Sequence, residues 1–114
     1  MREAVQQLLI DIEGELKRLD LWQSSRPSAA ALESQQPFAM DTLEFHQWLQ
    51  FIMLPRLQAL IDGRHPLPKN IAVSPMATHV YRHELDMHYA LITHIQQLDM
   101  TLSGRDPLAG EQSS

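Results

Sequence analysis

The apolar residues of this chain recur at intervals of three and four, the spacing that places side chains on one face of an α-helix. The clearest face, in residues 2–20, collects Val5, Leu8, Leu9, Ile12, Leu16 and Leu19. No comparable alternation of apolar and polar residues, which would indicate strands, competes with this pattern. The sequence therefore predicts an all-α fold, an irregular four-helix-like bundle with a Pro-kinked central helix and short additional helices.

The central helix is expected over residues 41–62. Asp41 and Glu44 have the spacing of a helix-capping box, in which each side chain accepts a hydrogen bond from the other residue's backbone N–H. Pro55 lies inside the apolar pattern, where it removes one backbone hydrogen bond and collides with the preceding turn. The pattern resumes after Pro55 on a rotated face, so we expect a kink there. Gly63 is expected to end the helix in the left-handed conformation.

Other helices are expected at residues 29–32, 75–83 and 86–102. The first is a single turn within a connection rich in Ser, Ala and Pro, and Ser28 is its expected cap. Two prolines at alternate positions keep residues 64–73 extended. In this scheme residues 1–104 form a single domain and residues 105–114 a disordered tail.

Composition narrows the functions open to such a bundle. The chain contains no Cys, which excludes disulfides, thiolate metal sites and thiol nucleophiles. It has 9 Lys and Arg against 14 Asp and Glu, and its net charge of -5 is spread evenly along the chain. Because counterion release needs clustered cations, no direct nucleic-acid contact is expected. The charged N-terminus and the lack of a long apolar run predict a cytoplasmic protein without membrane contact.

Six histidines raise the question of a metal site. His79 and His83 are four residues apart, a spacing that lets two ligands face each other on one helix. A third ligand at a firm spacing is missing from the sequence. We therefore expect neither a metal nor another cofactor.

Two charged residues fall on apolar helix faces. Asp99 lies inside the stripe of residues 86–102, and Arg56 lies on the apolar face of the central helix. An unpaired buried charge costs several kcal/mol, so we expect a structural pair between Arg56 and Asp99, with Asp20 as the second choice for the acidic partner. The alternative is that Arg56, with Trp48 nearby, lines a groove for an anion or for a partner's carboxylate.

Several short blocks of sequence together resemble a known family. They are Gln36–Phe45, Trp48–Phe51, Pro55–Leu57, Pro66–Pro68, Ile71–Val73, Pro75 and Leu98–Asp99. As a set they resemble the core signature of the YqcC-like family of small helical bacterial proteins, over about residues 3–103. The family is sometimes labelled tRNA pseudouridine synthase C, and its members are often encoded beside that enzyme. The resemblance implies a four-helix-like bundle with an accessory role for that synthase.

The favoured hypothesis is a non-enzymatic protein-interaction or accessory factor whose partner is an RNA-modifying enzyme. Its interaction surface is expected near Phe38, Trp48 and Arg56. The sequence is also compatible with a homo-oligomer. The alternative is a small-ligand-binding role, or an RNA-modifying role related to tRNA pseudouridine synthase, that uses Asp20 or Asp99. Asp20 ends an Arg-Leu-Asp tripeptide that also carries the nucleophile of one class of these synthases. A contiguous exposed apolar patch favours the first hypothesis, and a deep cleft with a carboxylate on its floor favours the second.

Overall fold

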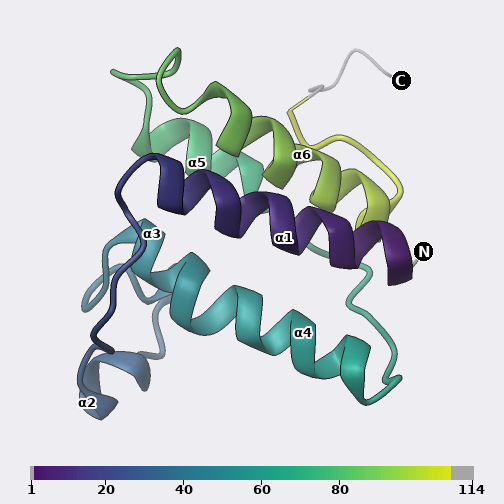
Figure 1. The fold of residues 1–114 in the computed structure, drawn as a ribbon, viewed down its shortest axis with the longest axis horizontal. Helices are drawn as coiled ribbons and strands as arrows, with labels where there is room; N and C mark the ends of the chain where they lie inside the picture. Colours follow the sequence, from purple (N-terminus) through teal and green to yellow (C-terminus); the bar gives the residue numbers. More distant parts are fainter. Residues whose placement is uncertain (1, 109–114) are drawn as a thin grey trace.

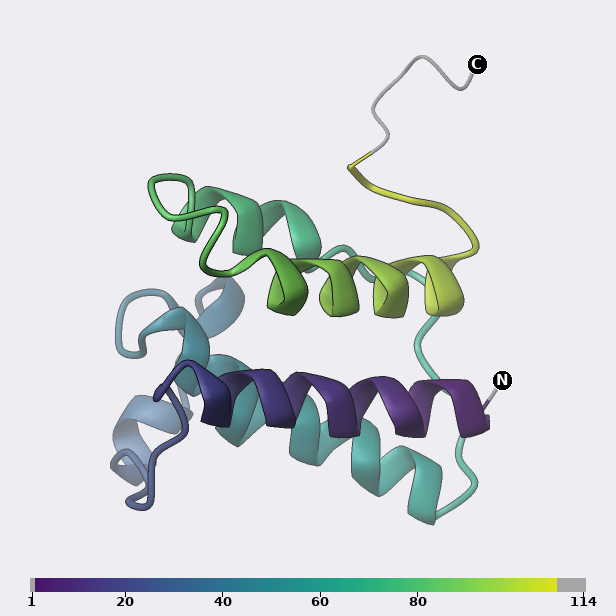
Figure 2. The same ribbon diagram turned by 45° about the horizontal axis from the view of Figure 1, so that its top comes forward.

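A computed structural model describes residues 2–108 of the chain (Figure 1). Within this range the regular structure is helical and contains no strand, which confirms the predicted all-α class. The longer helices are α1 (Arg2–Arg18), α4 (Leu54–Asp62) and α6 (Tyr89–Ser103). In Figures 1 and 2, α1 lies between α6 on one side and α4 on the other. None of the helices in this range has both the length and the apolar character needed to cross a membrane.

The shorter helices connect and flank these three. They are α2 (Ala29–Leu32), the 3-10 turn η1 (Pro37–Ala39), α3 (Phe45–Trp48), the π-helical segment η2 (Leu49–Met53) and α5 (Ser74–Val80). The Oγ of Ser28 accepts a hydrogen bond from the N–H of Ala31 at 3.1 Å, which confirms the predicted cap of α2. The segments α3, η2 and α4 follow one another without a break and together form the central helix.

The hydrophobic core lies where the apolar stripes of these helices meet. The stripe predicted for α1 is buried from Val5 to Leu16, whereas Leu19 is only partly buried beyond the helix end. Opposite it, α6 buries Leu91, Ile95 and Leu98 completely. Helical spacing concentrated apolar side chains on single faces, and packing those faces together removes them from water.

The central helix begins later than its sequence signal predicts. The prediction of a capping box formed by Asp41 and Glu44 is wrong, because α3 begins at Phe45 with Glu44 as its N-cap. The N–H of Glu44 donates to Gln47 Oε1 at 2.8 Å, and the Asp41 carboxylate accepts from the Ser34 hydroxyl instead. Residues 40–43 form a turn after η1, so the backbone at Asp41 is not in position to start a helix.

The central helix leaves α-helical geometry directly before Pro55, and the kink expected there stays a prediction. The N–H of Leu54 donates to the carbonyl of Leu49, five residues earlier, and Pro55 occupies the first turn of α4. Such a π turn is wider than an α turn, and it accommodates a residue that lacks an N–H and crowds the preceding carbonyls. At the other end, Gly63 caps the helix after Asp62, as predicted, but its predicted left-handed conformation is wrong. Gly63 has φ of -86°, and the next residue, Arg64, takes the left-handed φ of 55°.

The break predicted between the last two helices is confirmed. Turns from Tyr81 to His88 separate α5 from α6, and Gly104 ends α6 with the left-handed φ of 80°. Of the predicted disordered tail, residues 105–108 are described, and Asp106 there accepts a hydrogen bond from the side chain of Gln96. Residues 109–114 lie outside the described part of the chain.

Candidate functional site

A groove of about 410 Å³ opens beside the central helix. One side is formed by η1, α3 and the adjoining turns of the central helix, and the other by residues 68–73, which lead into α5. We call it the Trp48 groove. It brings together Phe38, Trp48 and Arg56, the residues predicted to form an interaction surface, although its use for binding stays a prediction.

An aromatic cluster forms one wall of the Trp48 groove. The ring of Phe38 meets that of Trp48 edge-on with centroids 4.8 Å apart, and Trp48 stacks against Phe45 at 6.1 Å. Phe38 and Ala39 both have positive φ, 57° and 51°, a conformation that costs about 1–3 kcal/mol for a residue with a side chain. This strained turn directs the Phe38 ring toward Trp48, and the aromatic contacts offset part of its cost.

The opposite wall is attached to α6 by side-chain hydrogen bonds. The Ser103 hydroxyl accepts from the N–H of Ile71 at 3.2 Å and donates to the carbonyl of Ile71 at 2.7 Å. The Asp99 carboxylate accepts from the N–H of Val73 at 3.0 Å and from the N–H of Ser74 at 2.8 Å. The Ser74 hydroxyl donates to the same carboxylate at 2.7 Å. These bonds fix the position of the wall relative to the helical core.

The predicted pair of Arg56 and Asp99 is wrong. Asp99 is completely buried, as expected for a charge on an apolar face, but its charge is balanced by the backbone N–H groups that begin α5. Arg56 is exposed, and within residues 2–108 it forms no ion pair. Asp20 is not its partner either; it is exposed beyond the end of α1 with a φ of 62°.

Neither acidic residue of the catalytic alternative lines the Trp48 groove. Asp99 has no exposed surface, and its hydrogen bonds all go to the start of α5. Asp20 is exposed but does not line the Trp48 groove. The pair His79 and His83 is exposed too, and α5 ends at Val80, so the two side chains do not share a helix face. In residues 2–108, no three potential ligands come together as a metal site requires.

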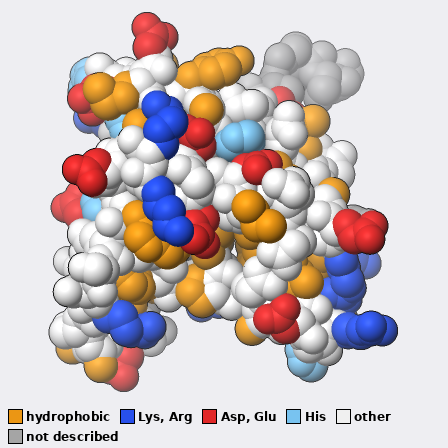
Figure 3. Space-filling model, in the orientation of Figure 1, with side chains coloured by type: hydrophobic (Ala, Val, Ile, Leu, Met, Phe, Trp, Pro, Cys, Tyr) orange, Lys and Arg blue, Asp and Glu red, His pale blue; other side chains and the backbone are white. Residues whose placement is uncertain are grey.

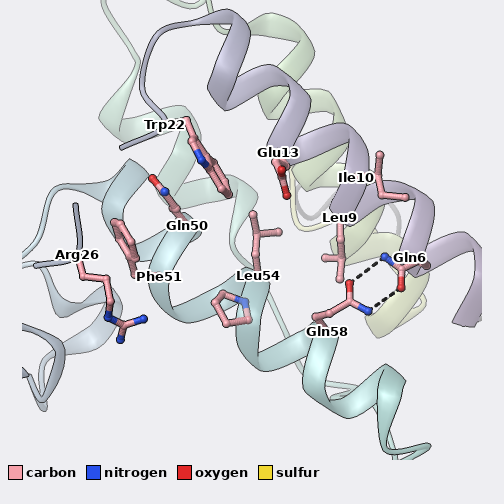
Figure 4. A pocket seen from close by; sticks show the side chains of 11 residues that line it. Gln6, Leu9, Ile10, Glu13, Trp22, Arg26, Gln50, Phe51, Leu54 and Gln58 are labelled. Atoms are coloured by element: carbon pink, nitrogen blue, oxygen red, sulfur yellow. Dashed lines mark hydrogen bonds between the residues drawn. The ribbon is translucent and has the colours of Figure 1, made fainter. Parts of the chain in front are cut away.

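Sequence reasoning missed a second groove, of about 360 Å³, between α1 and the central helix (Figure 4). Apolar side chains such as Ile10, Phe51 and Leu54 line it, and apolar side chains are visible between the two helices on this face in Figure 3. Figure 4 shows Gln6 and Gln58 joined across it by two amide hydrogen bonds of 2.8 and 2.7 Å. Glutamines at these positions look like ordinary surface residues in the sequence, so no signal identified them.

Two titratable groups near α3 have shifted pKa values. Burial lowers the pKa of His46, against a smaller opposing effect from the charge of Glu44. Burial raises the pKa of Tyr81 to about 12, and the charge of Glu44 contributes to the increase. The Tyr81 hydroxyl is buried without a hydrogen-bond partner in the described residues.

The unpaired hydroxyl of Tyr81 predicts how a Tyr81→Phe variant will behave. At neutral pH its free energy of unfolding is expected to equal or exceed that of the wild type, because removing an unpaired buried hydroxyl loses no hydrogen bond. The pKa is higher in the folded state than its ordinary value of 10.0, so the wild type loses stability as pH rises from 10.0 through about 12. The variant lacks this contribution. Urea unfolding of both proteins at neutral pH and at about pH 11 measures it, and equal losses at high pH would contradict the prediction.

Known proteins are similar to this chain in sequence and in fold. A family model described as tRNA pseudouridine synthase C (DUF446) matches residues 4–101. The chain is 40% identical over 75 residues to an uncharacterized protein of Haemophilus influenzae, covering 66% of this chain and 71% of that protein. It is 31% identical over 88 residues to the uncharacterized protein YqcC of Escherichia coli, covering 77% of this chain and 81% of YqcC.

The chain is also similar to a protein of solved structure and to part of a longer protein. The solution NMR structure of Escherichia coli YqcC matches with a TM-score of 0.79 at 28% identity, over 90% of this chain and 87% of that one. A Pectobacterium carotovorum protein named tRNA pseudouridine synthase C is 41% identical over 66 residues, which are 58% of this chain but only 18% of that protein. These similarities confirm the predicted resemblance to the YqcC-like family.

Proposed function

We propose that this chain, which belongs to the YqcC-like family, is a protein-interaction factor that binds tRNA pseudouridine synthase C through the Trp48 groove. The observation that carries the proposal is the groove itself. It gathers Phe38 from η1, and Trp48 and Arg56 from the central helix, around one apolar depression. Trp and Arg are the residue types that most often dominate the binding energy of protein interfaces.

The charges of the chain favour a protein partner over RNA. The net charge is -5, and Arg56 is the one charged side chain among the described residues that lines the Trp48 groove. RNA binding relies on many cations that neutralise successive phosphates, and a single arginine in an acidic protein does not supply them. An apolar groove with one cation at its edge suits a protein surface.

The identity of the partner is suggested by the longer relative. In the Pectobacterium protein, the part that matches this chain makes up 18% of a protein named tRNA pseudouridine synthase C. In that protein the YqcC-like part and the larger remainder belong to one polypeptide, which keeps them close to each other. If the two parts work together, proteins that carry them as separate chains need a binding surface, and the Trp48 groove offers one.

Binding of the two purified proteins tests this proposal. We expect the full chain to bind tRNA pseudouridine synthase C in isothermal titration calorimetry, and Trp48→Ala to weaken the affinity about 30-fold, or about 2 kcal/mol. Phe51→Ala is the matched control, since Phe51 is an aromatic residue of the same helix that lines the other groove. It should change the affinity less than about threefold.

Each part of the proposal has its own contrary result. Absence of binding by the wild type would overturn the choice of partner. Equal affinities of wild type and Trp48→Ala, with both folded by circular dichroism, would overturn the choice of groove. Equal losses in Trp48→Ala and Phe51→Ala would overturn it as well, because they would reflect general damage to the central helix.

A further inference from the structure

One wall of the Trp48 groove presents unpaired backbone groups. The N–H and the carbonyl of Ile71 both form hydrogen bonds with the Ser103 side chain, and the N–H of Val73 donates to Asp99. These three backbone groups therefore point toward α6. In a trans peptide unit, the carbonyl of one residue and the N–H of the next point in opposite directions. The N–H and carbonyl of Ala72 therefore point away from α6. Ala72 is exposed, lines the groove and makes no hydrogen bond within residues 2–108.

The charge that the described lining of the groove carries is positive. Arg56 lines it, is exposed, and has no carboxylate partner in the described part of the chain. Among residues 2–108, no Asp or Glu lines the groove, although acidic residues outnumber basic ones in the chain as a whole. The groove is thus a local positive site, suited to a carboxylate.

We propose that the Trp48 groove binds a partner's peptide segment in an extended conformation, with an apolar side chain and a nearby carboxylate. The apolar side chain packs between Trp48 and Ile71, and the carboxylate pairs with Arg56. The segment's backbone forms a pair of hydrogen bonds with the N–H and carbonyl of Ala72, as an added strand does at a sheet edge.

An extended segment fits this groove better than a helix does. A helix uses its backbone groups internally and would leave those of Ala72 unpaired at the interface. An extended segment satisfies them and directs alternate side chains to one side, so one residue can enter the groove while another two positions along stays near it. The inference rests on the proposed function in taking this groove as a protein-binding surface. It does not depend on which protein binds.

Selection from a displayed library of random peptides tests the recognition chemistry. With the full chain as bait, we expect the enriched peptides to combine a large apolar residue with Asp or Glu one to three positions away. Against the bait Arg56→Glu, we expect Lys or Arg at the acidic position instead. Arg26→Glu, which alters an arginine of the other groove, is the matched control and should leave the selected sequences unchanged.

The second readout uses one enriched peptide. It measures the affinity of the peptide for the chain and the amide chemical shifts of the chain when the peptide binds. We expect Arg56→Glu to weaken its binding at least tenfold in fluorescence anisotropy, and a Lys in place of the peptide's acidic residue to restore binding to that variant. The amide resonance of Ala72 should move downfield on binding, while that of Ile71, already bonded to Ser103, moves little. Methylation of the peptide backbone N–H that donates to the Ala72 carbonyl removes that hydrogen bond and should weaken binding in the anisotropy assay.

Several results would overturn this inference. They are the absence of any enriched peptide, enrichment without acidic residues, an unmoved Ala72 resonance, and displacement of the peptide by single-stranded oligouridine. If the synthase binds in a Trp48-dependent manner and the peptides fail, the proposed function stands and this recognition mode falls. If peptides bind as described and the synthase does not, the recognition mode stands and the partner is another protein.

Discussion

Replacement of Asp99 by Ala is expected to lower the free energy of unfolding by about 3–5 kcal/mol. Asp99 is completely buried, and its carboxylate accepts hydrogen bonds from two backbone N–H groups and one hydroxyl at the start of α5. Without the carboxylate, these donors have no acceptor, and α5 loses the anion that complements its dipole. Urea unfolding followed by circular dichroism measures the change.

Three further variants identify the cause. Asp99→Asn keeps the size of the side chain and one acceptor oxygen, so we expect roughly half of the loss. Asp106→Ala removes a partly buried hydrogen bond that the side chain of Gln96 donates, and it should cost less than about 1 kcal/mol. Arg56→Ala should cost less than about 0.5 kcal/mol, because Arg56 is exposed and unpaired in residues 2–108. Equal losses for Arg56→Ala and Asp99→Ala would show that the two charges interact after all.

Asp99 also illustrates where prediction from sequence stops. Its place on an apolar face of α6 was enough to predict a buried charge that needs compensation. The compensating groups are backbone N–H groups of Val73 and Ser74, some 25 residues away. Every residue except proline carries such a group, so the side-chain pattern contains no trace of the pairing. A cationic side chain was the visible candidate, and it was wrong.

The helices were predictable because apolar spacing is a local property of the chain. The start of the central helix was not, because two capping signals compete there. Asp41 with Glu44, and Glu44 with Gln47, are both suitable pairs by type and spacing. Contacts with α2 decide between them. The Thr42 hydroxyl donates to the carbonyl of Ala31 at 2.7 Å, and this holds residues 40–43 in a turn.

The candidate site was predictable in part. Arg56 stood out because a charge is unexpected on an apolar helix face, and Phe38 and Trp48 were named with it. The structure places all three around one groove. The wall formed by residues 70–73 did not stand out, because its contribution to the groove is its backbone. Which backbone groups are free depends on the positions of Ser103 and Asp99 on another helix. That information is tertiary, and a single sequence does not carry it.

Replacement of Gln50 by Ala is expected to lower the free energy of unfolding by about 2–3 kcal/mol. Gln50 lies in the π-helical segment η2 and is 6% exposed. Its side chain accepts from the backbone N–H of Gln23 at 2.9 Å and donates to the backbone carbonyl of Gln23 at 2.7 Å. Ala leaves both backbone groups unpaired and frees the connection after α1, including Trp22. Urea unfolding gives the energy, and Trp fluorescence reports the environment of Trp22 and Trp48.

Two comparisons separate the hydrogen bonds of Gln50 from its volume. Gln50→Leu fills the space and still leaves the backbone of Gln23 unpaired, so we expect it to remain less stable than the wild type. Gln58→Ala removes a partly exposed amide pair with Gln6, which water can replace, and should cost less than about 1 kcal/mol. If Leu at position 50 restores full stability, apolar filling is what the site requires. In that case, the π turn would serve packing at Pro55, and the attachment of Gln23 would contribute little.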